Sequence, residues 1–398
     1  MKEISRIAKA VQASTTLVVD ALYKQMLAEG KDVVGFGAGE PDFDTPDNIK
    51  EAAYKAIKDG QTKYTPASGM PVLKKAIVER LASDCGVTYA PEQIVVASGA
   101  KHSIYIALQT LLNPGDEVIL PAPYWVTYAE AIKMAAGVPV IINAPESSDF
   151  KITKNQLEAA VSDKTKLFIL NNPSNPTGML YGVDELRALA DVCVKHDIYI
   201  MADEIYYNLV YDGRKFTSVA QLGEDIRERT IIINGVSKAY AMTGWRIGYS
   251  ASNTQLAKVM GNYLSHSTLS PSTISQLAAV EAYTGPQESV AEMRKAFEQR
   301  RDYIVERINS IEGVSCRKPE GAFYIMLNIE KQIGRTLGGK LISNSDDFSL
   351  AFLESNNVAA VSCSGFGCDN FIRLTYATSM EAIKKGMDRL DNFINSAQ

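Results

Sequence analysis

A lysine among small and apolar residues is the strongest chemical signal in the sequence. Lys238 stands in the segment Asn234–Gly248, and Arg246 follows it eight positions later. Desolvation by apolar neighbours favours the neutral amine, which is the form that makes a Schiff base with a carbonyl compound. A guanidinium nearby suits a phosphate dianion. The segment therefore indicates covalent binding of a phosphate-bearing cofactor, which a solvated surface lysine would not explain.

Polar groups also follow other apolar runs. Asp203 comes directly after Ile198–Ala202, and a carboxylate in such surroundings needs a positive or hydrogen-donating partner. Asn175 lies in the sequence NNPSNPTG, whose two prolines and glycine fix the backbone. The small-residue turn Ser98–Lys101 opens a helix, so its backbone N–H groups are free to hold a phosphate. Taken alone, this turn is a weak signal.

The elements that must position these groups alternate between residues 90 and 250. Short apolar, β-branched runs are separated there by amphipathic stretches such as Val183–His196, which is typical of helices packed on a mostly parallel sheet. Ligands bind beyond the carboxyl ends of the strands in such sheets, where the polar groups stand. The predicted strands are Ile94–Ala97, Glu117–Leu120, Val138–Ile142, Lys166–Leu170, Ile198–Ala202 and Thr230–Ile233.

The two ends of the chain have a different pattern. They contain long charged helices such as Glu292–Asn309 and a few strands such as Ala322–Leu327 and Phe371–Tyr376. We therefore predict a second, smaller α+β unit, with the loop Glu330–Ser345 as a mobile cover. The predicted division is an N-terminal arm at 1–12, a small domain at 13–46 and 286–398, and a large cofactor-binding domain at 47–285.

Composition limits the class of partner. The 398 residues are 46% hydrophobic and 22% charged, and the formal net charge is -5, which gives no broad basic surface for nucleic acid or anionic lipid. Five irregularly spaced cysteines without a C-x-x-C pair favour a reducing cytoplasm. We find no secretory signal and no apolar stretch of membrane-spanning length, so we expect no membrane partner.

At the level of motifs, the segment Gly235–Gly248 resembles the lysine signature of class I and II aminotransferases of fold type I. Other motifs occur in that family's order: Tyr64–Gly69, Pro123–Trp125, Asn172–Gly178, Asp203–Tyr206 and Phe371–Leu374. The resemblance covers nearly the whole chain and is strongest to the bacterial aspartate aminotransferases that use a lysine for substrate recognition. It implies an α/β large domain, with a mostly parallel seven-stranded sheet flanked by helices, and a smaller α+β domain.

This resemblance implies pyridoxal 5'-phosphate as the cofactor, held as an internal aldimine on Lys238. The same lysine would then move the proton between the substrate Cα and the cofactor. Asp203 would bind the pyridinium N–H, and Tyr206 with Asn175 would bind the phenolic oxygen. Trp125 would stack on the ring. The implied phosphate contacts are Gly99, Ala100, Lys101, Ser237 and Arg246. Relatives often carry a hydroxyl three residues before the lysine, where this chain has Gly235.

Substrate and subunit contacts are also implied by the resemblance. Arg373 would take the substrate α-carboxylate as a bidentate pair, with the backbone near Gly39 closing the other side. Trp125 and Asn175 would contact the substrate too. Lys101 and Thr16 match the positions that meet the distal carboxylate. In this family the counterpart of Tyr64 reaches the phosphate of the neighbouring subunit, which implies a homodimer with shared active sites.

The predicted reaction is ping-pong transamination between aspartate and 2-oxoglutarate. Prephenate transamination is less favoured, because Gln12 stands where prephenate-using relatives carry a basic residue. Aromatic or broad-specificity transamination and β-elimination stay open, because the same electron sink serves them all. A non-catalytic homologue of the transcription-regulator type is disfavoured, because the fold is expected to begin within about 15 residues, without a preceding helix-turn-helix domain.

Two other cofactor classes are disfavoured. The sequence Gly35–Glu40 lacks the third glycine of a dinucleotide-binding loop, which argues against a nicotinamide enzyme. The histidines are far apart and lack ligand partners at metal spacing: His102, His196 and His266. No catalytic metal is therefore predicted. Glu204 is conspicuous only because it follows Asp203, and we interpret it as structural.

Overall fold

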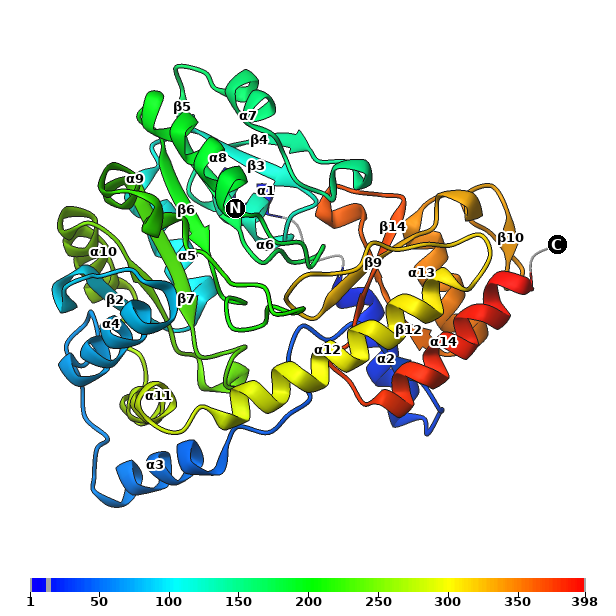
Figure 1. Ribbon diagram of the computed structural model, residues 1–398, viewed down its shortest axis with the longest axis horizontal. Coiled ribbons are helices and arrows are strands. Elements are labelled where there is room, and N and C mark those ends of the chain that lie inside the picture. Colours follow the sequence, from blue (N-terminus) through cyan, green and yellow to red (C-terminus); the bar gives the residue numbers. More distant parts are fainter. Residues whose placement is uncertain (1, 12–15, 397–398) are drawn as a thin grey trace.

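The structure is a computed structural model that describes residues 2–11 and 16–396. Within these residues a large sheet has the strand order β2-β8-β7-β6-β5-β3-β4 (Figure 1). Strand β8 is antiparallel to both of its neighbours, and the other pairs are parallel. The strands are β2 (Ile94–Ala97), β3 (Glu117–Ala122), β4 (Val138–Asn143), β5 (Thr165–Asn171), β6 (Tyr199–Asp203), β7 (Thr230–Gly235) and β8 (Gly248–Ala251).

The predicted seven-stranded, mostly parallel sheet is thereby confirmed. The six predicted strands form, Ile94–Ala97 with the predicted bounds and the other five with shifts of one or two residues at their ends. Strand β8 was not predicted, because its residues Gly-Tyr-Ser-Ala contain no apolar run. It is nevertheless buried along its whole length, between β2 and β7.

Helices cover both faces of this sheet. Ile231 and Ile233 of β7 pack with α5 and α10, whereas Ile232 between them packs with α4 and α11, as the two-residue period of a strand requires. One face carries α5 (Ala100–Leu111), α6 (Thr127–Met134) and α10 (Thr254–Ser267). The opposite face carries α3 (Asp47–Lys58), α4 (Pro71–Cys85), α7 (Lys154–Ala160), α8 (Val183–Lys195), α9 (Glu224–Arg229) and α11 (Thr273–Thr284).

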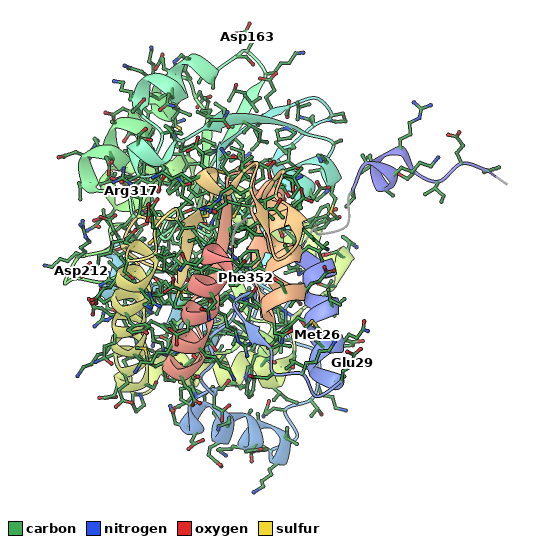
Figure 2. The ribbon with its side chains drawn as sticks, turned by 90° about the vertical axis from the view of Figure 1, so that its right-hand side faces the viewer. Met26, Glu29, Asp163, Asp212, Arg317 and Phe352 are labelled. Carbon is green, nitrogen blue, oxygen red and sulfur yellow. The ribbon has the colours of Figure 1, made fainter. Side chains whose placement is uncertain are left out.

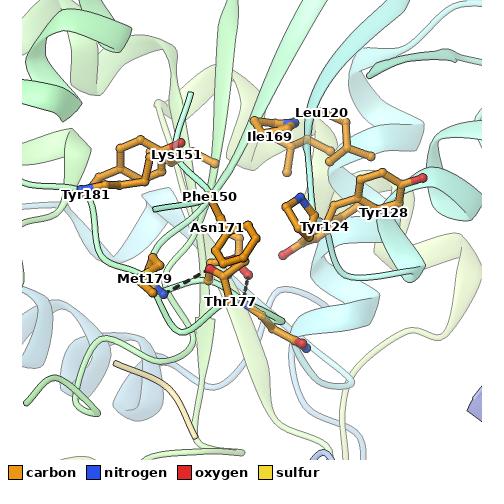
Figure 3. Close-up of a pocket in the computed structure, with 15 residues that line it drawn as sticks. Leu120, Tyr124, Tyr128, Phe150, Lys151, Ile169, Asn171, Thr177, Met179 and Tyr181 are labelled. Carbon is orange, nitrogen blue, oxygen red and sulfur yellow. Dashed lines mark hydrogen bonds between the residues drawn. The ribbon is translucent and has the colours of Figure 1, made fainter. Parts of the chain in front are cut away.

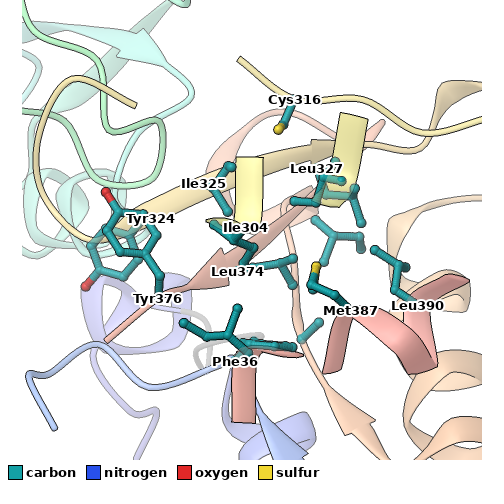
Figure 4. Close-up of a cluster of buried hydrophobic side chains, with 14 of the residues drawn as sticks. Phe36, Ile304, Cys316, Tyr324, Ile325, Leu327, Leu374, Tyr376, Met387 and Leu390 are labelled. Carbon is teal, nitrogen blue, oxygen red and sulfur yellow. The ribbon is translucent and has the colours of Figure 1, made fainter. Parts of the chain in front are cut away.

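The smaller unit joins both ends of the chain around one apolar core, part of which Figure 4 shows. Phe36 packs there with Leu374 and Leu390, and β1 pairs with β12 in parallel. Its sheets contain β1 (Val34–Gly35), β9 (Tyr324–Asn328), β10 (Thr336–Leu337), β11 (Lys340–Leu341), β12 (Val358–Ala359), β13 (Val361–Ser362) and β14 (Phe371–Thr375). Its helices are α2 (Thr16–Ala28), α12 (Glu288–Asn309), α13 (Ser345–Asn356) and α14 (Met380–Asn395).

Helix α12 connects the two units. Val290 near its start lies in the core beside α4 and α11, and Ile304 lies in the core of the smaller unit. The limits assigned to the two domains stay a prediction. Figure 2 shows the N-terminal segment projecting from the body, and α1 (Arg6–Ala10) within it lies beside α6. No helix in the described ranges combines the length and the apolar character needed to cross a bilayer.

Candidate active site

The carboxyl ends of the large sheet open into a cleft of about 1240 Å³. This volume accommodates a cofactor together with a small substrate. Strand pairing sets Asn171 at the end of β5 beside Asp203 at the end of β6. The cleft is lined by most of the predicted site residues: Gly39, Ala100, Lys101, Trp125, Asn175, Asp203, Tyr206, Ser237, Lys238, Arg246 and Arg373.

Lys238 lies in the segment after β7, where the protein partly removes it from water. Its Nζ donates a hydrogen bond to the Gly39 carbonyl and lies 5.8 Å from the centre of the Phe323 ring. Desolvation is the main reason that the pKa of this amine is lowered to about 8. A lysine with this pKa is about one-tenth neutral at pH 7, far more than an ordinary lysine, and the neutral amine is the form that nucleophilic attack and proton transfer require.

Asp203 is the buried acid of the cleft. The Tyr128 hydroxyl donates to its Oδ2 at 2.6 Å, and the Ile205 N–H donates to its Oδ1 at 3.2 Å. Burial raises the pKa of Asp203 to about 6, although both hydrogen bonds favour the charged form. It forms an ion pair with none of the described basic residues. A positively charged N–H in the cleft would supply the missing partner.

Arg246 and the start of α5 form an anion-binding corner. Arg246 adopts a left-handed backbone conformation with φ 57°, which is uncommon for a residue with a side chain. Its guanidinium donates to the Thr243 carbonyl at 2.8 Å and to the Ser98 carbonyl at 3.4 Å. Gly99 has φ 88°, and a Cβ there would collide with this guanidinium. Arg246 pairs with none of the described carboxylates, so a phosphate fits beside it and the N-terminus of α5.

The glycine three positions before Lys238 has a structural reason. A Cβ on Gly235 would lie 2.7 Å from the Ile247 carbonyl oxygen and 2.8 Å from Gly248 Cα. Strands β7 and β8 therefore approach too closely for a serine or threonine at this position without movement of the backbone. The hydroxyl that is often present in relatives is excluded here by packing.

Arg373 supplies a second anion-binding corner, which comes from β14 of the smaller unit. It is 5% exposed, and its guanidinium carbon lies 4.5 Å from the Tyr324 ring centre. Nη1 donates to Asn175 Oδ1 at 3.3 Å, Nη2 donates to the Gly37 carbonyl at 2.9 Å, and Nε has no partner among the described atoms. Since no described carboxylate pairs with it, the guanidinium suits a carboxylate ligand.

Lys101 reaches the same cleft from the first turn of α5. Its Nζ lies 4.9 Å from the centre of the Trp125 ring. Desolvation, with a smaller contribution from Arg246, lowers the pKa of Lys101. This lysine also pairs with none of the described carboxylates, and cations this close together are stabilised by a bound anion.

Two of the predicted residues whose side chains or backbone the structure describes, Gly99 and Tyr64, do not line the cleft. Gly99 lies just behind it as the N-cap of α5. Tyr64 is 89% exposed on the surface of the single chain. The side chain of Thr16 lies outside the described set, as does all of Gln12. The loop Glu330–Ser345, our expected cover, is also absent from the described lining; Ser364–Phe366 borders the cleft instead.

Two tyrosines of the site were missed in the sequence. Tyr128 stands three residues after Trp125 at the start of α6, and their rings meet edge to face at 5.4 Å. Its closeness to Trp125 in the sequence could therefore have indicated that Tyr128 also belongs to the site. The pairing of β9 with β14 brings Tyr324 to the cleft, and no local sequence pattern predicts this pairing. Beside the cleft lies a small cavity of about 30 Å³, which shares Tyr124, Tyr128 and Asn175 with it (Figure 3).

The arrangement combines a buried acid, an amine of lowered pKa and two guanidinium groups that pair with no carboxylate in the described part of the chain. These fit the pyridine nitrogen, the carbonyl carbon and the phosphate of pyridoxal phosphate, together with a substrate carboxylate. No group of three or more potential metal ligands occurs among the described His, Cys, Asp and Glu residues.

Comparison with known proteins agrees with this chemistry. The family "Aminotransferase class I and II" matches residues 31–390. An aspartate aminotransferase from Bacillus sp. (strain YM-2) is 47% identical over 395 residues, which are 99% of this chain and 100% of that protein. An aspartate/prephenate aminotransferase from Cereibacter sphaeroides is 47% identical over 96% of each chain. The crystal structure of the aspartate aminotransferase from Rhizobium meliloti superimposes with a TM-score of 0.96 and 41% identity over 100% of both chains.

The chain therefore belongs to the class I and II aminotransferases. It is a transferase that moves an amino group from an amino acid to a 2-oxo acid in two successive half-reactions, and its cofactor is pyridoxal 5'-phosphate.

Proposed function

We propose that this enzyme transfers the amino group of aspartate to 2-oxoglutarate. The observation that carries the proposal is that Arg373 and Lys101, two cations without an acidic partner among the described residues, line the same cleft as Lys238. Both of these substrates are dicarboxylates, so each has one carboxylate for each cation. The names of the Bacillus and Rhizobium relatives support the same choice.

The proposed roles of the cofactor-binding residues follow from their surroundings. Pyridoxal phosphate, when bound, supplies an electron sink for the bond broken at the substrate Cα. Lys238, whose amine is partly neutral, takes the proton from Cα and returns it during the transfer. Asp203 accepts the pyridine N–H, and Trp125 covers the ring. Tyr206 and Asn175 bind the phenolic oxygen, and Arg246, Ser237 and the turn Gly99–Lys101 bind the phosphate.

We further propose a cytoplasmic homodimer in which the partner's Tyr64 completes the phosphate site. The 89% exposure of Tyr64 suits contact with a second copy. The protruding N-terminal segment likewise exposes Ile4 (69%) and Ile7 (45%), which a partner subunit would cover. Sedimentation equilibrium tests the dimer, and a Tyr64→Phe change that leaves cofactor affinity unaltered would contradict the role of this residue.

Prephenate is the second candidate substrate. The Cereibacter relative, which is named for aspartate and prephenate together, is as similar as the Bacillus protein. Prephenate also carries two carboxylates, so Arg373 and Lys101 are compatible with it. A faster reaction with prephenate than with 2-oxoglutarate would favour this candidate.

The test is a half-reaction screen on the purified protein with its cofactor. Single amino acids are mixed with it, and the loss of the yellow absorbance of the bound cofactor is followed. We expect aspartate and glutamate to react much faster than phenylalanine. Fast reaction with neutral or aromatic amino acids would keep the mechanism but overturn the substrate, and a protein that binds no chromophore would overturn the role of Lys238.

The Lys101→Ala variant tests the distal contact separately. Loss of one charge-assisted hydrogen bond is expected to raise KM for aspartate about 10- to 100-fold, with a much smaller effect on phenylalanine. The matched control is Lys195→Ala, because Lys195 pairs with Glu158 far from the cleft. Equal changes in KM for aspartate and phenylalanine would exclude a distal-carboxylate role for Lys101.

A further inference from the structure

Tyr324 stands between the apolar core and the cleft. It lies on β9, opposite Thr375 of β14, and is 1% exposed. Figure 4 shows it at the edge of the core cluster, with its hydroxyl directed away from the aliphatic side chains. The same side chain lines the cleft that contains Lys238. A tyrosine in this place exposes its polar end to the reaction site while its ring is held by packing.

The contacts of Tyr324 reach two parts of the proposed machinery. Its hydroxyl lies 3.1 Å from the Tyr206 hydroxyl. Its ring lies 4.5 Å beneath the guanidinium of Arg373 and meets the Tyr206 ring edge to face at 5.8 Å. A Cβ on Gly39 would lie 3.3 Å from the Tyr324 hydroxyl, so the segment that accepts the Lys238 hydrogen bond passes directly beside it.

The pair of hydroxyls has few ways to arrange its hydrogens. Each hydroxyl donates one hydrogen and can accept another. Burial raises the pKa of both Tyr206 and Tyr324, so both keep their protons. If Tyr206 donates to the phenolic oxygen of the cofactor, its own oxygen is left to accept the hydrogen of Tyr324. Hydrogen bonds in such a chain polarise and strengthen one another.

We propose that Tyr324 is a positioning residue that links substrate-carboxylate binding at Arg373 to cofactor binding at Tyr206. Its ring holds the guanidinium of Arg373, and its hydroxyl donates to the Tyr206 oxygen, which strengthens the donation from Tyr206 to the cofactor. This inference rests on the proposed role of Tyr206. With Tyr324, which lies on β9, a residue of the smaller unit joins those that influence the bound cofactor.

The two ends of Tyr324 can be tested separately, with the protein carrying its cofactor. Donation from Tyr206 withdraws charge from the phenolic oxygen, which lowers the pKa of the nitrogen that joins Lys238 to the cofactor. Absorbance titration measures this pKa, and titration with the unreactive dicarboxylate maleate measures the affinity at Arg373. We expect Tyr324→Phe to raise the pKa by about 0.5 to 1 while maleate affinity changes less than about twofold.

The Tyr324→Leu variant also removes the ring beneath Arg373. It is expected to give the same rise in pKa together with an about 10-fold loss of maleate affinity. Tyr376→Phe is the matched control, because Tyr376 is a buried tyrosine of the same core whose hydroxyl donates to the Ala322 carbonyl at 3.3 Å. This control is expected to lower the melting temperature and to leave the pKa of the nitrogen that joins Lys238 to the cofactor unchanged.

The double variant Tyr206→Phe/Tyr324→Phe separates positioning from a general structural effect. If Tyr324 acts through Tyr206, the double variant shows no larger pKa rise than Tyr206→Phe alone. The inference is overturned if Tyr206→Phe raises the pKa and Tyr324→Phe does not, or if the two rises add. No rise in either single variant would instead overturn the proposed role of Tyr206, and this inference with it.

Discussion

Asp203 and Glu204 are neighbours in sequence, yet they lie in two different regions of the molecule. Asp203 faces the cleft on the side of α6, where Tyr128 and the Ile205 N–H donate to it. Glu204 is 2% exposed and lies within the layer behind the sheet, where only Oε1 accepts a side-chain hydrogen bond, from Ser218 at 2.7 Å. Its Oε2 has no partner among the described atoms.

The difference between these regions shows in the pKa of each acid. Burial raises both values, to about 6 for Asp203 and to about 8 for Glu204. The opening toward a positive partner in the cleft keeps Asp203 available as an anion, whereas Glu204, whose pKa is raised further by the neighbouring Asp203 charge, is mostly protonated at pH 7. Burial of a carboxyl group alone therefore does not mark a functional acid. The opening of Asp203 toward the cleft distinguishes it from Glu204.

Neutralising each acid in turn is expected to show the largest difference between Asp203 and Glu204. Asp203→Asn removes the negative charge that would balance the pyridinium, and we expect kcat for aspartate to fall by about 10³-fold or more. Glu204→Gln replaces an already neutral group, so its kcat should stay within about twofold. Single-turnover kinetics with aspartate measure both, and a large loss in Glu204→Gln would show that the rear acid also acts in catalysis.

Glu204→Gln, which should hardly change kcat, is expected to change the free energy of unfolding. The folded chain keeps the Glu204 proton up to about pH 8, whereas the unfolded chain releases it near the usual glutamate pKa of 4.5. Wild-type stability therefore falls as pH rises between these values. Glu204→Gln removes that cost and should raise the free energy of unfolding by about 3 kcal/mol at pH 7, with little effect at pH 4.5. Urea unfolding of both proteins at both pH values measures this change. An equal change in the free energy of unfolding at the two pH values would contradict a titrating Glu204.

A smaller effect is expected from the donor to Asp203. Tyr128→Phe removes a hydrogen bond that lowers the pKa of Asp203, so less of the acid is ionised and kcat/KM should fall about 10-fold near pH 7. The loss should grow as pH falls, because the variant's carboxyl group keeps its proton to a higher pH. A pH-independent loss would mean that Tyr128 acts only through packing. Tyr207→Phe is the control, because its hydroxyl donates to Asp84 outside the cleft.

The smallest effect concerns Ser218, the side-chain donor to Glu204. Ser218→Ala leaves both carboxyl oxygens without a side-chain donor and is expected to destabilise the fold by about 1 kcal/mol without changing kcat. Thermal unfolding and steady-state kinetics give the two readouts. An unchanged melting temperature would show that water replaces the serine hydroxyl.

The local groups of the site could be predicted because each follows an apolar strand. Lys238 and Asn175 follow β7 and β5, Asp203 is the last residue of β6, and parallel strands bring such positions to one edge of a sheet. The strands themselves were visible as buried apolar runs. Strand β8 was not, because its burial comes from its neighbours and not from its own residues.

Sequence alone thus determined the sheet, the lysine segment and the kind of cofactor, since these depend on short-range patterns of residue type. Only the tertiary structure placed Arg373 against Asn175, Tyr128 against Asp203 and Tyr324 against Tyr206. Those pairs are separated by 198, 75 and 118 residues, so no local period relates them. The tertiary structure also decided that Asp203 faces the cleft and that Glu204 faces the core. Strand pairing and helix packing fix which side of the chain at the end of β6 meets which layer.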